Sequence, residues 1–309
     1  MQRLTDERGA VGVMIAMLLV PLLGFAAVAI DVAAMYSERQ QLQTGADAGA
    51  LAIAQDCNRG ACGTPAQTAQ TFAAANLTGS QPTATVPTLT ASRVSVENSA
   101  VRAHWFAPVL GVNSTVLHAR STVSWGSPIA GTAVLPLAFS WCEWNAQTGG
   151  GLPSGTTPRT IYFPKSSDLP CTGPSNLPVP GGFGWLITDA GTCRTTSSIA
   201  GIIASDPGNS VPSSCSATDL TNARGRTVLL PIYDQVTGTG SGARYRVYGY
   251  AAFTFTGYHF GGQNSWNAPC SGDNRCIRGY FARFVDSSDS FHYGTGSPQL
   301  GATILTLTQ

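Results

Sequence analysis

Residues 9–30 read GAVGVMIAMLLVPLLGFAAVAI, a run without one charged side chain. At about 1.5 Å of rise per residue, a helix over these 22 residues spans about 33 Å, the thickness of a bilayer core. The apolar part of a secretory signal is shorter, at about 7–15 residues. The sequence therefore predicts a single-pass membrane anchor. A cleaved signal is the alternative, because Ala27-Val28-Ala29 has the form of a cleavage site.

The helical pattern continues beyond the apolar run. Met35, Tyr36, Leu42, Ala46, Ala50 and Ile53 keep spacings of three, four and seven, the period of an amphipathic helix. No proline occurs between Val32 and Thr64. We therefore expect one helix from about residue 9 to about residue 56, with its first half in lipid and its second half standing in water as a stalk. Pro21 is tolerated in a membrane and predicts a kink.

All eight cysteines follow the apolar run, and none forms a C-x-x-C motif. An even number of such cysteines predicts four disulfides, which persist only outside the cytoplasm. The N-terminus is then cytoplasmic and the C-terminal part extracytoplasmic. Proximity in the sequence favours the pairs Cys57–Cys62, Cys142–Cys171, Cys193–Cys215 and Cys270–Cys276, among 105 possible connectivities.

Three regions follow from the pattern along the chain. Residues 1–60 form the anchor and stalk. Residues 61–125 form a small α/β module, in which Thr64-Pro65 opens a helix to about Leu77 and Gly79–Thr88 is a connector. The strands expected in this module are Arg93–Val96, Ala100–Trp105 and Thr115–Trp125.

Residues 126–309 predict a mostly β domain, because short apolar runs alternate with Gly, Pro and Ser loops. The fold class is therefore α+β: a long N-terminal transmembrane and stalk helix, a small α/β module, and a disulfide-bonded β domain outside the cytoplasm. The strands expected in the last region are Ala133–Ser140, Thr160–Phe163, Gly184–Thr188, Thr227–Tyr233, Arg244–Thr256, Arg278–Val285 and Thr303–Thr308.

The charge balance excludes a nucleic-acid binder. The chain has 17 basic and 16 acidic residues, a net charge of +1, so it lacks the basic surface that nucleic acid requires. Charged residues make up 11% of the chain, against roughly 25% in ordinary soluble proteins.

No coherent catalytic or metal-binding set is found in the sequence. The chain lacks a G-x-S-x-G elbow, and a hydrolase would have to be built from His259 and His292 with Asp286 and Asp289. Residues 286–290 match the D-x-S-x-S signature of von Willebrand A domains, but only 19 residues follow, so a Ser/Asp-rich turn is the favoured interpretation. We expect no enzymatic activity, no metal and no cofactor.

Two further sets of residues are candidates for binding. Four tryptophans could form a sugar-stacking platform, although aromatic residues of a β core are the commoner explanation; they are Trp141, Trp144, Trp185 and Trp266. On the helix, small residues four apart permit a partner helix to approach, and carboxylates could pair with it. The candidates for this partner contact are Gly12, Ala16, Gly24, Asp31 and Asp47.

Several unlike signals occur in a recognisable order: Arg8-Gly9, Pro21, Asp31, Tyr36, Arg39, Leu42-Gln43 and residues 46–52, ADAGALA. Together they resemble the N-terminal domain of TadG-like Flp (Tad) pilus-assembly proteins over about residues 7–56. The resemblance implies a bacterial single-pass membrane protein that works with a Tad pilus machine, its partners being the lipid bilayer, TadE-like proteins and pilin. Prepilin-type segments carry a glutamate five residues after the cleaved glycine, whereas Met14 stands there in this chain.

The function predicted is a non-catalytic component of a Tad-type pilus or envelope assembly, as a scaffold or minor pilin-like subunit. The alternatives are a surface-anchored module that binds carbohydrate or protein, and an anchored hydrolase.

Overall fold

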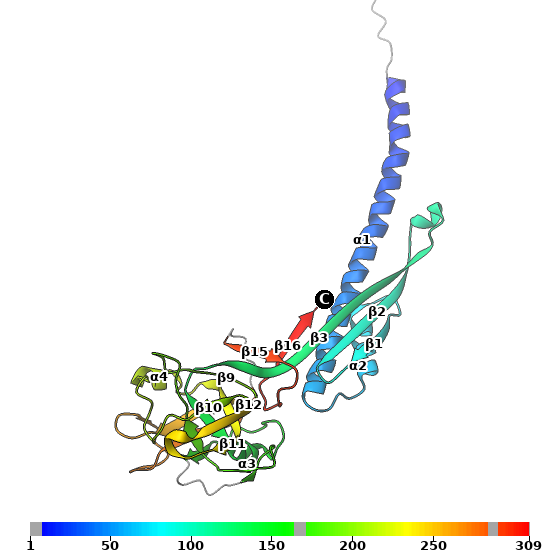
Figure 1. Cartoon of the computed structure of the whole chain (residues 1–309). Helices are drawn as coiled ribbons and strands as arrows, with labels where there is room; N and C mark the ends of the chain where they lie inside the picture. Colours follow the sequence, from blue (N-terminus) through cyan, green and yellow to red (C-terminus); the bar gives the residue numbers. More distant parts are fainter. Residues whose placement is uncertain (1–7, 164–170, 284–289, 309) are drawn as a thin grey trace, which may run out of the picture. The chain divides into compact units, whose positions relative to one another are not determined.

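A single helix, α1 (Arg8–Asn58), runs through 51 residues with Pro21 inside it. The prediction of one helix through the apolar run and the stalk is confirmed (Figure 1). The helix ends where Asn58-Arg59-Gly60 turns, and the Cys57–Cys62 disulfide closes that turn.

The computed structural model describes residues 8–163, 171–283 and 290–308. These residues form two units. The anchor unit consists of residues 8–124 together with 305–308, and the body unit consists of residues 125–304. The anchor unit contains both the stalk half of α1 and the region predicted as a small α/β module.

The anchor unit is an antiparallel sheet packed against the second half of α1 and against α2 (Pro65–Asn76). Its strands are β1 (Thr83–Leu89), β2 (Arg93–Ala103), the first part of β3 (Ser114–Ala133), and β16 (Ile304–Thr308), which pairs with β3. The short 3-10 helix η1 (Ala107–Leu110) lies in the turn between β2 and β3. The core of this unit is built around Leu42, Leu77, Ala100, Leu117 and Ala119.

The close contact between α1 and α2 depends on missing side chains. A Cβ atom at Gly45 would lie 3.2 Å from the Ala73 Cα and 3.1 Å from the Asn98 Nδ2, and one at Gly49 would lie 3.4 Å from the Ala69 Cα. Glycine at both positions therefore lets the two helices approach with little between their backbones. Gly45 and Gly49 in the stalk therefore serve the packing of this chain's own helices.

The body unit is built on an eight-stranded mixed sheet with the order β5-β14-β12-β11-β4-β8, in which β10 and β13 also pair with β12. Its central pair, β11 (Thr227–Thr237) and β12 (Arg244–His259), is antiparallel. The buried aromatic residues on this pair are Tyr233, Tyr245, Tyr250, Phe253, Phe255 and Tyr258. β9 and β15 pair with the second part of β3. The remaining elements are β4 (Leu137–Ser140), α3 (Trp141–Thr148), β5 (Arg159–Tyr162), β6 (Cys171–Thr172), β7 (Pro178–Val179), β8 (Phe183–Trp185), β9 (Thr195–Ser198), β10 (Ile202–Ala204), α4 (Ala217–Asn222), η3 (Gly240–Gly242), β13 (Ser265–Trp266), β14 (Cys276–Ala282) and β15 (Phe291–Gly294).

The core of the body is aromatic. Phe139, Phe253 and Phe281 lie within 5.5 Å of one another, measured between ring centroids, and Phe183 and Trp185 extend the cluster. Edge-to-face contacts dominate, which is the preferred geometry of such rings. The prediction of a mostly β, disulfide-bonded domain is confirmed.

Some element boundaries differ from the prediction. Residues 79–88, expected as a connector, contain β1, and the two short strands expected between Arg93 and Trp105 are one strand, β2. β1 is an edge strand with the sequence TATVPTL, and its threonines and Pro87 are typical of a connector as well as of an edge strand. α3 was also missed. Its signal is Ser140-x-x-Glu143, in which the Ser140 hydroxyl accepts a hydrogen bond from the Cys142 N–H at 3.1 Å.

The structure contains four disulfides, and they join the cysteines in the neighbouring pairs that proximity favoured: Cys57–Cys62, Cys142–Cys171, Cys193–Cys215 and Cys270–Cys276. The first lies in the anchor unit and the other three lie in the body unit.

Candidate functional site

The first half of α1 has no covering side chains. The large apolar residues from Val11 to Ile30 are all exposed, and none of the apolar window is buried. Among the residues that the structure describes, α1 is the one helix long and apolar enough to cross a membrane. A row of exposed side chains without charge is stable in lipid and unstable in water, so this half of α1 is a membrane anchor.

Asp31 is the first residue after the apolar run, and its carboxylate is only 3% exposed. Oδ1 accepts the N–H of Trp105 at 2.9 Å, while Oδ2 accepts those of Phe106 at 2.9 Å and Ala107 at 2.7 Å. Three charge-assisted hydrogen bonds therefore hold the start of the β2–β3 turn to the point on α1 where the apolar run ends.

The sequence predicts Asp31 as a contact with a partner helix, and that contact stays a prediction. Within the chain, the carboxylate is buried and both of its oxygens accept backbone N–H groups. Tyr36, expected in the apolar pattern of the stalk, is exposed, since the face buried by Asp31 and Leu42 does not include it.

A second contact fixes the same turn about two helical turns further along α1. The Arg102 guanidinium forms an ion pair with the Glu38 carboxylate, and both side chains are largely buried. The same guanidinium lies over the ring of Trp105, 4.7 Å from its centroid. The ion pair and the cation–π contact thus help to fix the position of Trp105, whose N–H donates to Asp31.

The other expected contact residues of α1 lie in two settings. At Gly12 and Gly24 an added Cβ would meet no atom within 4 Å, and Ala16 is exposed beside them. Asp47 is half-buried and accepts a hydrogen bond from Gln43 Nε2 at 2.9 Å, one turn earlier on the same helix. Contact of Gly12, Ala16, Gly24 and Asp47 with a partner helix stays a prediction.

The residues considered for catalysis are only partly described. The His259 ring lies 2.6 Å from the Ser265 Oγ through Nδ1 and 3.2 Å from the Gly272 carbonyl oxygen through Nε2, where β12 pairs with β13. Asp286 and Asp289, and with them the D-x-S-x-S match, lie outside the described residues. Within the described ranges, no group of three or more His, Cys, Asp or Glu side chains is placed to hold a metal ion.

The tryptophans do not form an exposed platform. Trp144 and Trp185 are buried, and Trp141 and Trp266 are half-buried against the same core. Trp185 packs edge-on against Phe183 and Phe260 in the aromatic cluster. The aromatic-core interpretation is therefore the correct one for these residues.

The body unit has a cleft with a volume of about 620 Å³. Its walls combine aromatic rings with turn residues: Tyr233, Tyr245, Pro180, Asp206 and Asn209 are among them. Apolar walls with a few polar groups are typical of small-ligand sites.

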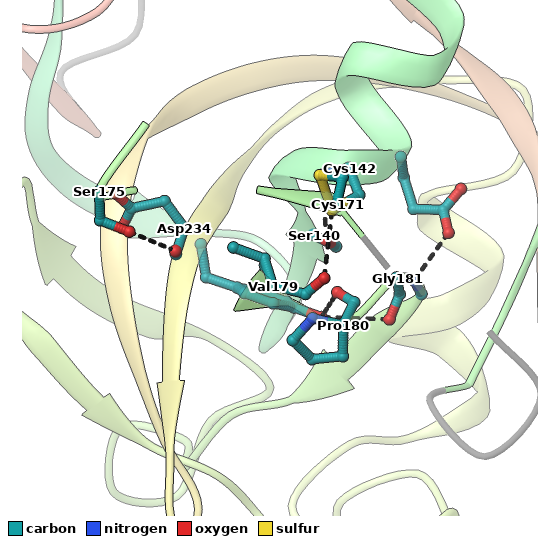
Figure 2. Close-up of a disulfide and its surroundings, with 11 residues drawn as sticks. Ser140, Cys142, Cys171, Ser175, Val179, Pro180, Gly181 and Asp234 are labelled. Atoms are coloured by element: carbon teal, nitrogen blue, oxygen red, sulfur yellow. Dashed lines mark hydrogen bonds between the residues drawn. A yellow bond between two sulfur atoms is a disulfide. The ribbon is translucent and has the colours of Figure 1, made fainter. Parts of the chain in front are cut away.

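One wall of this cleft is fixed by the segment that Figure 2 shows. The Cys142–Cys171 disulfide joins the first turn of α3 to β6, and β6 pairs with β7. The Glu143 carboxylate accepts the Gly182 N–H at 2.7 Å. The Ser175 hydroxyl donates to the Asp234 carbonyl oxygen at 3.0 Å (Figure 2). Covalent and polar contacts therefore hold both ends of residues 171–182 to the core.

Two buried carboxyls lie beside this wall. Burial raises the pKa of Glu143 above its ordinary value, against the opposing effects of the Gly182 N–H and Arg159. Burial also raises the pKa of Asp234, although Arg246 lies 3.2 Å from its Oδ2 and favours the charged form.

The sequence predicts a short loop or turn at Phe106–Gly111, where the structure has one, but the apolar surface of residues 105–112 was not singled out. The signal was present, because the segment WFAPVLGV has no charged residue and is rich in apolar side chains, which is unusual for a turn at the surface.

A comparison with protein families matches residues 9–56 to the Flp pilus-assembly TadE/G-like family (Tad). The matched segment contains the apolar run, Asp31 and the stalk half of α1 as far as its buried Ile53 and Ala54. No curated protein and no solved structure matches the chain.

Proposed function

We propose that this chain, which carries a TadE/G-like Flp pilus-assembly domain at residues 9–56, is a non-catalytic scaffold or minor pilin-like subunit of a Tad-type pilus assembly. The domain supports a role related to the pilus, and the bare apolar half of α1 supports anchoring in the membrane. The body unit then stands outside the cytoplasm, because its three disulfides persist only there.

The observation that carries the proposal is a difference between the two halves of α1: the second half contacts its own chain, whereas the large apolar side chains of the first half are exposed. From Asp31 onward, the helix is engaged by its own chain: Asp31 holds the β2–β3 turn, and Gly45 and Gly49 receive α2. Before Asp31, Gly12 and Gly24 have open surroundings. Contact with TadE-like or pilin helices is therefore left to the small residues of the membrane half, where close backbone approach favours association.

The test is a pull-down of Tad components with the full-length chain. We expect the double variant Gly12→Leu with Ala16→Leu to recover severalfold less partner, because leucine keeps the backbones apart. The matched control is Val13→Leu with Met17→Leu, which changes exposed apolar residues at neighbouring positions of the same turns. Equal recovery by the two variants, together with normal pili after deletion of the gene, would refute the proposal.

The cleft of the body unit favours a second candidate, a surface-anchored module that binds carbohydrate or protein. Its test is a glycan array probed with the full chain in detergent. Binding that is lost in Asp206→Ala with Asn209→Ala would support this function, and an array without signal would remove the carbohydrate form of it.

A further inference from the structure

The turn at residues 105–112, called here the WFAPVLGV loop, carries an exposed apolar surface. Val109 is 90% exposed, Leu110 72% and Trp105 65%, and Phe106 and Val112 add to the same surface. No residue of the loop is charged. A contiguous apolar surface of this kind on a water-soluble part marks a binding surface.

The position of the loop identifies what it meets. Asp31 binds the N–H groups of Trp105, Phe106 and Ala107, and Asp31 directly follows Ile30, the last residue of the uncharged run. The loop is therefore held beside α1 at the level where the membrane-spanning segment ends (Figure 1). The apolar surface of the loop continues the apolar surface of the anchor.

The backbone of the loop is suited to a poorly hydrated environment. Three N–H groups are bound by Asp31, and Pro108 has none. Val109 N–H donates to the Phe106 carbonyl at 3.1 Å, Gly111 N–H to that of Pro108 at 3.0 Å, and Val112 N–H to that of Ala107 at 3.2 Å. Peptide groups with internal partners can leave water at low cost, whereas unpaired ones cannot.

The edge of the loop has the chemistry of a membrane–water boundary. Trp105 combines a large apolar ring with one polar N–H, a combination that is enriched at this boundary. Arg102, at the end of β2 that precedes the loop, lies over this ring and pairs with Glu38. Charged side chains therefore lie directly beside the apolar loop.

We propose that the WFAPVLGV loop inserts into the interfacial layer of the lipid bilayer and gives the anchor unit a second membrane contact beside α1. Asp31 sets the depth of this contact, because it fixes the loop to the helix at the end of the span. The proposal rests on membrane anchoring by α1, and it does not depend on which pilus proteins bind the chain.

The experiment measures quenching of Trp105 in vesicles. The full-length chain is reconstituted in phosphatidylcholine vesicles with and without bromine-labelled acyl chains, which quench only tryptophans that reach the lipid. Because Trp105 is one of six tryptophans, its contribution is the difference between the wild type and Trp105→Phe. We expect that difference to lose most of its intensity in brominated vesicles and to resist the water-soluble quencher acrylamide.

A matched control moves the probe to the other end of the sheet. Leu89 is exposed and pairs with Val94, at the end of β2 that lies opposite the loop. In the Trp105→Phe background, Leu89→Trp should be quenched by acrylamide and not by brominated lipid. Quenching of both probes by lipid would show that the whole sheet lies on the membrane, which overturns a contact limited to the loop.

Two further outcomes would overturn the proposal. If acrylamide quenches Trp105 and brominated lipid does not, the loop stands in water. If neither agent quenches it, another protein segment covers the loop. The pull-down with the Gly12 and Ala16 variant is independent of these results, so a failure here is distinguishable from a failure of the proposed pilus role.

Discussion

From Val11 to Ile30, α1 exposes its large apolar side chains, whereas from Asp31 to Ala54 the same helix buries one face against α2 and the sheet. Both halves contain glycine and alanine at spacings that permit close approach. In the second half Gly45 and Gly49 receive α2, and in the first half Gly12 and Gly24 face open space. Similar small-residue patterns thus serve the fold in one half and remain available to other molecules in the other.

The largest difference between the halves should come from removing apolar side chains. Leu42 is 1% exposed and packs in the core of the anchor unit, so Leu42→Ala should lower the free energy of unfolding by about 2–5 kcal/mol. Leu22 is 65% exposed, and Leu22→Ala should change that free energy by less than about 0.5 kcal/mol. Urea unfolding in detergent micelles, followed by circular dichroism, measures both. Equal losses of unfolding free energy in the two variants would contradict the difference in packing between the two halves of α1.

Adding side chains should give a smaller difference of the same kind. Gly45→Leu places new atoms where Ala73 and Asn98 already lie, so it should cost about 1–3 kcal/mol of stability or separate α2 from α1. Gly12→Leu meets no neighbour and should leave stability unchanged while it weakens partner recovery. The same unfolding measurement tests the first statement. A stable Gly45→Leu protein would contradict the role given to this glycine.

The boundary between the halves can be tested through Asp31. Asp31→Ala removes the acceptor of three N–H groups, so amide hydrogen exchange at Trp105, Phe106 and Ala107 should lose its protection. Asp47→Ala is the matched control, since Asp47 contacts Gln43 on its own helix. Protection that survives in Asp31→Ala would show that the ion pair of Arg102 with Glu38 holds the turn alone.

Features carried by local sequence were predictable from it. The span of α1 follows from continuous helical periodicity, and the start of α2 follows from Thr64-Pro65, with Pro65 in the first turn. The disulfide pairs close short loops, so proximity in the sequence indicated them.

Features that depend on distant contacts were not predictable. Asp31 and its partner Trp105 are 74 positions apart in the sequence. No local sequence pattern indicates which backbone N–H groups a carboxylate at the end of a membrane segment will bind. The edge strand β1 is defined by its pairing with β2 rather than by its residues. The tryptophans of the body unit are buried or half-buried against a core built from several parts of the chain, so their spacing could not separate a core from a platform.

The smallest predicted effect contrasts two buried carboxyls, one in each unit. Asp31 receives three backbone N–H groups, whereas Glu143 receives one, from Gly182, and burial raises the pKa of Glu143 above 4.5. Because the folded protein then binds this proton more tightly than the unfolded chain, the free energy of unfolding should fall as the pH rises from 4.5 through the raised pKa.

Glu143→Gln keeps an acceptor for the Gly182 N–H and cannot ionise, so it should remove this part of the pH dependence. Urea unfolding of the body unit, followed by tryptophan fluorescence across that pH range, measures the difference. Parallel pH profiles for the wild type and the variant would show that folding does not raise the pKa of Glu143.

The pairing of β16 with β3 has a consequence for biosynthesis. β16 belongs to the anchor unit, yet it follows the whole body unit in the chain, so residues 125–304 are an insertion between two neighbouring strands of one sheet. A ribosome delivers the membrane helix first and the strand that completes its sheet only after the entire body. The edge of β3 that pairs with β16 therefore stays unpaired until synthesis is complete. A chain truncated anywhere in the body would be inserted in the membrane with that edge free to pair with other strands.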